Sequence, residues 1–223
     1  MDRTSYTNLA KAWEFVEDHA FSRQSVELNA VRTRAEETGI AQGSAAQAEL
    51  LRVLVHMIGA SSVIAVGTGS VVETLQLVNG LENGGQLTAV DSSSQGIALI
   101  RTLFNHLSDE IQTTLRAVNA PAGVFLPRLN AETYDLIVVA GDPGNYDASF
   151  DQPPRLLKSH GVIVFTDMLA FESAESAGGV LNPANRDAKS VAMRTLLETV
   201  ESDERFVTTL TPTGTGLLVA VKR

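Results

Sequence analysis

Apolar residues along this chain alternate between long windows with helical spacing and short continuous runs. The continuous runs predict buried strands at 62–66, 86–90, 115–118, 135–140, 161–167, 206–212 and 216–222. Helical windows separate the first six runs, which is typical of a mostly parallel sheet covered by helices. Only Thr213, Gly214 and Thr215 separate the last two runs, so they predict a hairpin with an antiparallel final strand. The sequence therefore predicts an α/β protein with a doubly wound, Rossmann-like sheet of six parallel strands and a reversed seventh.

The N-terminal region has helical spacing without a strand beside it. One apolar stripe carries Leu9, Trp13, Val16 and Ala20. A second, more charged helical window follows it. We interpret residues 1–40 as a helical segment that either covers the sheet or makes a subunit contact, and the lone Trp on an apolar stripe favours the cover. The main domain is then 41–223.

Short motifs predict helix starts and test a candidate membrane span. Two capping boxes, Ser44 with Gln47 and Ser92 with Gln95, predict the first turns of two helices. The apolar stretch 53–72 is long enough to cross a bilayer. Because GASS and GTGS interrupt it, we expect a buried helix, a turn and a buried strand instead.

Composition narrows the classes of function. The chain has 223 residues, of which 44% are hydrophobic, so it can bury a full-sized core. Its 26 acidic and 17 basic side chains give a net charge of -9, which disfavours binding to nucleic acid or an anionic membrane. The absence of cysteine excludes thiol nucleophiles, disulfides and thiolate zinc sites. The polar N-terminus lacks the apolar region of a signal peptide, so we expect a cytoplasmic protein.

A glycine turn and a carboxylate indicate a nucleotide-type cofactor. Gly67 and Gly69 follow the first strand and let a ligand approach the backbone at the N-terminus of the next helix. Asp91 ends the second strand, where a carboxylate can accept both hydroxyls of a ribose. A dinucleotide fingerprint would need a third glycine where this chain has Val72. Each feature also has a structural explanation, since such turns are common and Asp91 with Ser92 suits a helix cap. Their combination favours a cofactor site.

Five blocks of the sequence resemble one enzyme family. They are GIAQGSAAQAELLRVLVHMIGASSVIAVGTGSVVETLQL, LTAVDSS, YDLIVVAGDPGNY, LLKSHGVIVFTDMLA and TPTGTGLLVAVKR. In this order and spacing, from about residue 39 to the end, the chain resembles the catechol and caffeoyl-CoA O-methyltransferases, which use S-adenosylmethionine. The resemblance implies the class I methyltransferase fold, a small hydroxylated substrate, and a homodimer in which residues 1–40 take part. It also implies that the loop 168–187 partly covers the acceptor.

The same resemblance implies a set of cofactor-binding residues. They are Ala65, Gly67, Thr68, Gly69, Glu73, Asp91, Ser92, Pro121, Ala122 and Ala140. The glycine turn would approach the methionine part of the cofactor, Asp91 would hold its ribose, and Pro121 with Ala122 would lie along the adenine. Two positions depart from the family's pattern. Ala65 stands where the family usually has an acidic residue, and Glu73 stands where it often has serine or threonine.

The divalent metal site of the resembling family is largely missing. Its fourth-strand motif reads Asp-Ala-Asp-Lys, in which the first aspartate binds the metal and the lysine helps to deprotonate the acceptor. The aligned residues here are Ala140, Gly141, Asp142 and Pro143. The family's Asp-Asn pair after the fifth strand is Asp167 and Met168. A hard cation needs several oxygen ligands, so we expect no metal.

Asp142 and Asp167 are the candidate catalytic residues. Methyl transfer from a sulfonium is an in-line displacement, so positioning the acceptor supplies part of the catalysis and a base supplies another part. Both aspartates follow neighbouring strands, and either is a candidate acceptor for the substrate's proton. The alternative is structural: Asp142 begins a DPGN turn and Asp167 caps the following loop. Tyr146 either lines the acceptor pocket or packs on the sheet.

Three functions stay open on the sequence alone. The first is a metal-independent O-methyltransferase for a small hydroxylated acceptor. The second is a protein that binds S-adenosylmethionine or its product without turnover, which the missing metal and lysine positions equally permit. The third, an NAD(P)-dependent reductase, is disfavoured by Val72 and by the reversed final strand.

Overall fold

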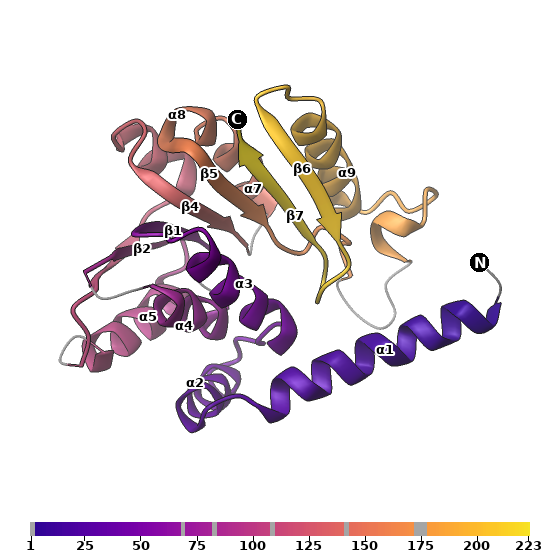
Figure 1. Ribbon diagram of the computed structural model, residues 1–223, viewed down its shortest axis with the longest axis horizontal. Helices are drawn as coiled ribbons and strands as arrows, with labels where there is room; N and C mark the ends of the chain where they lie inside the picture. The colour runs from indigo at the N-terminus through magenta and orange to yellow at the C-terminus, as the bar shows by residue number, and fades with distance from the viewer. Residues whose placement is uncertain (1–2, 68–69, 82–83, 108–109, 141–142, 172–177) are drawn as a thin grey trace.

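A computed structural model describes residues 3–67, 70–81, 84–107, 110–140, 143–171 and 178–223 (Figure 1). Its strands are β1 (Ser62–Val66), β2 (Gln86–Asp91), β3 (Thr114–Asn119), β4 (Tyr134–Val139), β5 (Leu157–Phe165), β6 (Phe206–Thr211) and β7 (Leu217–Lys222). They form one sheet in the order β3-β2-β1-β4-β5-β7-β6. β7 is antiparallel to both neighbours and the other pairs are parallel, which confirms the predicted doubly wound topology with its reversed last strand.

Helices cover both faces of this sheet. The helices are α1 (Arg3–Ser22), α2 (Val26–Glu37), α3 (Ala45–Met57), α4 (Val71–Gly80), α5 (Ser94–Leu107), α6 (Ala122–Phe125), α7 (Pro143–Phe150), α8 (Pro153–Leu156) and α9 (Ala188–Glu201). One core layer packs α2, α3, α4 and α5 on the sheet, and the other packs α6, α7 and α9. Alternation along β1 assigns its residues to the layers, because Val63 and Ala65 face the first and Ile64 and Val66 the second.

The first helix lies apart from the sheet. α1 packs against α3 and runs along the outside of the molecule (Figure 1). Trp13 is 54% exposed and Val16 is 50% exposed, while Ala20 of the same stripe is buried, so most of this stripe lies outside the core of the single chain. The Glu17 carboxylate fixes α1 in place by accepting from the backbone N–H groups of Ala45 and Ala46 at the start of α3. No helix in the described part of the chain is long and apolar enough to cross a membrane.

Local sequence signals explain where the helices begin. Ser44 accepts from the Gln47 N–H at 3.0 Å, as the capping box predicts. At α5 the cap is Ser93 rather than Ser92, because the Asp91 carboxylate accepts from the Ser93 N–H at 2.8 Å and places the cap one residue later. The expected DPGN turn begins at Asp142, outside the described residues, and its remaining residues open α7, since proline suits the first position of a helix.

Two connections differ from the sequence-based expectations. β5 begins at Leu157, earlier than predicted, and includes His160 at φ 61°, where its pairing with β4 shifts register. Small residues, two glycines and the pair Asn182-Pro183 predict a mobile connection at 168–187, whose described ends are held by hydrogen bonds. The Arg194 guanidinium donates to the Asn182 carbonyl at 2.6 Å, and the Val180 N–H donates to the Leu169 carbonyl at 3.0 Å.

A close approach of two strand ends should make Gly67 essential for stability. Gly67 has φ +79°, and an added Cβ would lie 2.0 Å from the Ala140 carbonyl oxygen. We expect Gly67→Ala to lower the free energy of unfolding by about 3 kcal/mol or more, because it adds a backbone clash to a strained φ. Urea denaturation measures this loss. Gly39→Ala is the matched control, since Gly39 has φ +81° with nothing within 4 Å, and it should cost only about 1 kcal/mol. Equal losses would contradict the clash.

Candidate functional site

The predicted site residues gather at the carboxyl edge of the parallel strands. Gly67 follows β1, Asp91 ends β2, Ala140 follows β4 and Asp167 follows β5. The strand order reverses at β1, which has β2 on one side and β4 on the other, and ligands of such sheets bind at this switch point. Backbone hydrogen bonds join the strand ends, from Gly67 N–H to the Val90 carbonyl at 2.9 Å and from Ala140 N–H to the Val66 carbonyl at 2.8 Å. Thr68, Gly69 and Asp142 lie outside the described residues.

Asp91 joins the end of β2 to the end of β3. Asp91 is 8% exposed, and its carbonyl accepts from the Asn119 amide and the Ala120 N–H, both at 2.9 Å. α6 begins directly after this connection, with Pro121 exposed and Ala122 buried. The residues predicted for ribose and adenine therefore lie next to one another, and Ser92 is exposed between them.

Glu73 is a buried carboxylate in the first turn of α4. It is 5% exposed and accepts a hydrogen bond from the Gln47 side-chain amide at 2.5 Å. The pKa of Glu73 is raised to about 7. Burial is the largest cause, the nearby Asp167 carboxylate adds to it, and Gln47, Ser70 and Arg32 oppose it. Glu73 is therefore about half ionised near neutral pH.

Gln47 and Thr215 connect Glu73 to Asp167. The Gln47 amide oxygen accepts from the Thr215 N–H at 3.4 Å, and the Thr215 hydroxyl donates to the Asp167 carboxylate at 2.5 Å. We call this chain of four side chains, Glu73, Gln47, Thr215 and Asp167, the carboxylate network. It links α4, α3, the β6–β7 turn and the segment after β5. The two carboxylates at its ends are thus parts of one arrangement.

Asp167 is held in an unusual backbone conformation. Its φ is 57°, which is rare for a residue other than glycine. The backbone after it pairs with the β6–β7 turn, because the Met168 N–H donates to the Gly216 carbonyl at 3.1 Å and the Leu169 N–H to the Thr215 carbonyl at 3.0 Å. Asp167 stays half-buried while Met168 is 1% exposed. This pairing fixes the Asp167 carboxylate at the carboxyl edge.

Tyr146 completes the buried surroundings of Asp167. It is fully buried in α7, and its ring centroid lies 6.3 Å from that of Phe165 on β5, so it packs on the sheet. Burial and the Asp167 charge raise the pKa of Tyr146. Its hydroxyl lies near Asp167 and Thr166 but makes no hydrogen bond of normal geometry in the described structure.

The described donor set does not fit a divalent metal. Ala140 has no ligand atom, and Met168 offers a buried thioether beside Asp167. Among the described residues, no three His, Asp or Glu side chains are grouped as metal ligands. A hard cation requires several oxygen ligands, and at the positions where the resembling family holds its metal the described residues provide one carboxylate, that of Asp167.

Sequence analysis did not identify Gln47 and Thr215 as site residues. Gln47 carried a detectable signal, because it is a polar residue on the buried face of α3 between Ala45 and Ala48. Thr215 carried none, since a threonine in a hairpin turn is common. Its contact with Asp167 depends on how the hairpin packs against the segment after β5.

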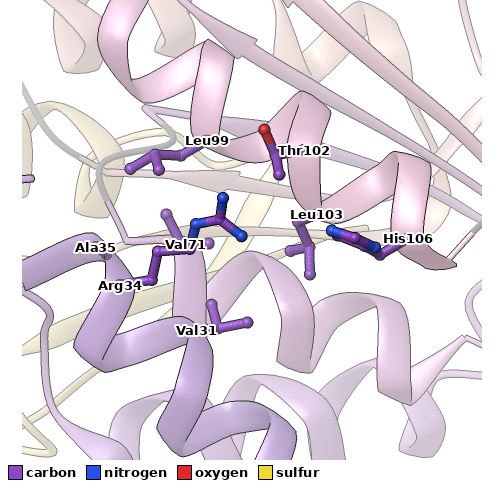
Figure 2. A pocket seen from close by; sticks show the side chains of 8 residues that line it. All are labelled: Val31, Arg34, Ala35, Val71, Leu99, Thr102, Leu103 and His106. Atoms are coloured by element: carbon purple, nitrogen blue, oxygen red, sulfur yellow. The ribbon is translucent and has the colours of Figure 1, made fainter.

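Two hollows lie outside this edge. Figure 2 shows one between α2, α4 and α5, where Arg34 and His106 flank the apolar side chains of Val31 and Leu103. Its volume of about 60 Å³ is too small for a nucleotide cofactor. A larger, open hollow of about 520 Å³ lies between α1, the start of α3 and the β6–β7 turn. Thr215 of the carboxylate network lies on its border.

The fold and this edge define a class I methyltransferase. The O-methyltransferase family model matches residues 16–223. A Mycobacterium marinum protein provisionally named an O-methyltransferase is 32% identical over 195 residues, which cover 87% of this chain and 84% of the relative. A Mycobacterium tuberculosis protein with the same provisional name is 32% identical over 199 residues, covering 89% and 86%. The chain therefore belongs to the O-methyltransferase family of enzymes.

Solved structures share the fold at low sequence identity. The O-methyltransferase of Bacillus cereus, in complex with S-adenosylhomocysteine, has a TM-score of 0.79 at 19% identity, covering 96% of this chain and 99% of that one. The O-methyltransferase TomG of Streptomyces achromogenes, in complex with S-adenosylmethionine, has a TM-score of 0.74 at 19% identity, covering 95% and 97%. Family membership leaves the NAD(P)-dependent reductase without support.

The raised pKa of Glu73 predicts how stability depends on pH. An unfolded glutamate titrates near 4.5 and folded Glu73 at about 7, so the folded protein binds more protons between these values. Stability should therefore fall as pH rises through this window, by up to about 3 kcal/mol from this group. Glu73→Gln should remove that part of the decrease when urea denaturation is followed from pH 4.5 to 8. The control Glu201→Gln, at an exposed position in α9, should keep it. An unchanged pH profile in Glu73→Gln would contradict the buried titration.

Proposed function

We propose that this enzyme transfers a methyl group from S-adenosylmethionine to a hydroxyl of a small acceptor, without a divalent metal. One arrangement supports the proposal above all. Asp91, a buried carboxylate at the strand end where such folds bind a ribose, lies beside Gly67. Ala140 and Met168 stand where the resembling family has metal ligands. The described residues could bind a nucleoside cofactor, and they offer a hard cation too few oxygen ligands.

The residues at the carboxyl edge suit S-adenosylmethionine. Asp91 would accept from the ribose hydroxyls, and Pro121 with Ala122 would border the adenine. Gly43 packs closely against Glu73, because an added Cβ would lie 3.3 Å from the Glu73 carboxylate and 3.9 Å from the Ser70 hydroxyl. When bound, the cofactor supplies a methyl group made electrophilic by its sulfonium.

Asp167 is the proposed base among the described residues. Its carboxylate is half-buried, and the Thr215 hydroxyl orients one of its oxygens. The other oxygen remains available to accept the proton of an acceptor hydroxyl as the methyl group transfers. Asp142 stays a second candidate base, since it lies outside the described residues.

The acceptor is proposed to be a small molecule. The open hollow of about 520 Å³ borders Thr215, which contacts Asp167, and this volume is within the range of small-molecule sites. Trp13, Val16 and Pro212 supply apolar surface there. With a net charge of -9, the chain does not favour a nucleic acid or an anionic membrane as a partner.

A homodimer is the proposed assembly. The described part of α1 exposes large apolar side chains, namely Leu9, Trp13, Phe15, Val16 and Phe21. Such a series on one helix is more apolar than a free surface needs, and burial against a second copy would remove it from water.

Metal independence predicts that chelation has no effect. The purified enzyme should bind S-adenosylmethionine with micromolar affinity in calorimetry, and the affinity should be the same with Mg²⁺ or with EDTA. Methyl transfer to a panel of phenols and catechols, followed with a radiolabelled methyl group, should likewise survive EDTA. Activity that requires added Mg²⁺ would overturn the proposal, because the metal would then need ligands that Ala140 and Met168 cannot supply.

Asp167→Asn is the matched variant for the same assays. It keeps the shape of the side chain and an oxygen for the Thr215 hydroxyl, so cofactor affinity should change little. Methyl transfer should fall by about 100-fold, the usual contribution of a positioned base. A variant with full activity would exclude Asp167 as the base and leave Asp142.

The apolar surface of α1 predicts a dimer in solution. Sedimentation equilibrium should give twice the mass of one chain for the wild-type protein. The double variant Leu9→Asp/Phe15→Asp should sediment as a monomer, because it places charges in the proposed contact. Val26→Asp is the control, since Val26 is 80% exposed on α2, and it should stay dimeric. A wild-type monomer would refute the assembly.

A further inference from the structure

Glu73 is a buried acid whose described neighbours do not neutralise it. α3 contributes the neutral amide of Gln47, and the start of α4 contributes the Ser70 hydroxyl. The segment after β5 contributes Asp167, whose negative charge opposes ionisation of Glu73. The nearest cationic group is Arg32 of α2, and its effect on Glu73 is the smallest of those acting there.

Arg32 makes contacts away from Glu73 through one of its nitrogens. Its Nη1 donates to the Gly43 carbonyl at 2.9 Å and lies 4.0 Å from the Glu36 carboxylate, and the guanidinium lies 5.5 Å from the ring centroid of Phe21. Its Nε and Nη2 are buried without a hydrogen-bond partner in the described structure. Among the described residues, no cation therefore forms a direct ion pair with Glu73.

Buried polar groups beside this network lack partners. The Ser70 hydroxyl near Glu73 and the Tyr146 hydroxyl near Asp167 are both buried without a hydrogen bond of normal geometry in the described structure. Buried polar groups in folded proteins are almost always satisfied, by protein, water or ligand. Both ends of the carboxylate network therefore have a buried hydroxyl that a further polar partner, water or ligand, would satisfy.

Glu73 lies in the layer that Ala65 faces. The side chain of Ala65 on β1 packs in the same core layer as Val71 and Val72 of α4. Glu73 follows these residues in the first turn of α4, the helix that comes after β1 in the chain. A carboxylate that is absent from β1 at position 65 is therefore present on the next helix.

We propose that Glu73 binds the α-ammonium group of the cofactor's methionine part, in place of an acidic residue at position 65. This inference rests on the proposed cofactor, S-adenosylmethionine. An ammonium brings three N–H donors and a positive charge, which satisfy a buried carboxylate. The sulfonium has no N–H to donate, and it belongs with the transferred methyl group near β4 and β5, where Asp167 lies. Ribose at Asp91 and ammonium at Glu73 would then hold the cofactor across the end of β1.

Glu73→Gln tests this assignment with two ligands. Both S-adenosylmethionine and S-adenosylhomocysteine carry the α-ammonium group, and only the first carries the sulfonium. Calorimetry at pH 7.5 should show that the variant weakens both ligands by about tenfold or more, through loss of a charge-assisted hydrogen bond. Glu201→Gln should bind both as the wild type does. A loss confined to S-adenosylmethionine would overturn the ammonium assignment.

Proton release gives an independent readout. Ionisation of Glu73 on binding should release about half a proton per cofactor near pH 7, measured from calorimetry in buffers of different ionisation enthalpy. The ligand's own amino group titrates near pH 8, so the difference between wild type and Glu73→Gln is the informative quantity. Equal release from the two proteins would overturn the proposal.

A relocated carboxylate gives the rescue experiment. Glu73→Ser should lose affinity for both ligands, and Ala65→Glu/Glu73→Ser should recover most of it, because the acid returns from the strand side of the same layer. Circular dichroism checks that each variant is folded. A folded double variant that binds no better than Glu73→Ser would argue against the shared role.

The wild type separates this inference from the proposed function. If the wild type itself binds neither ligand, the proposed cofactor fails. If the wild type binds while Glu73→Gln is unaffected, only the role of Glu73 fails.

Discussion

The close approach of Gly67 to Ala140 determines where the rest of the site can lie. An added Cβ at Gly67 would lie 2.0 Å from the Ala140 carbonyl oxygen, so the two strand ends meet with no room for a side chain. β1 and β4 are the strands at which the sheet reverses its order, and this contact joins them. Glu73 then approaches from one layer and Tyr146 from the other. Gly67 thus has a packing requirement that exists without any ligand.

The fold was predictable because its signals are local and redundant. Seven apolar runs and the short hairpin turn determined the topology, including the reversed last strand. The ends of helices and strands were less predictable where a local sequence signal competed with hydrogen bonds in the folded chain. The Asp91 carboxylate moved the helix cap from Ser92 to Ser93, and register with β4 extended β5 past His160. The role of α1 stayed open between a cover for the sheet and a subunit contact, because an apolar stripe does not specify whether its own chain or another covers it.

The candidate site was predictable in part. Asp91, Gly67 and Ala140 follow strands of a parallel sheet, so strand order alone brings them to one edge. The carboxylate network was not predictable, because Gln47 and Thr215 are 168 positions apart and meet only in the folded chain. In the sequence, Glu73 is only a departure from the pattern of the resembling family, because the sequence does not reveal its buried partners. In the folded chain, Glu73 accepts a hydrogen bond from the Gln47 side-chain amide.

A metal-free site and an ammonium contact at Glu73, both proposed above, would share one electrostatic consequence. A divalent cation normally offsets carboxylates gathered at one edge of a sheet, and the described residues here offer no ligand set for it. Positive charge from a ligand would therefore favour Glu73, because carboxylates in a low-dielectric interior destabilise one another when unpaired. S-adenosylmethionine carries an ammonium, a carboxylate and a sulfonium, and methyl transfer removes only the sulfonium charge. The product keeps its ammonium group, so the proposed contact at Glu73 would last from cofactor binding to product release.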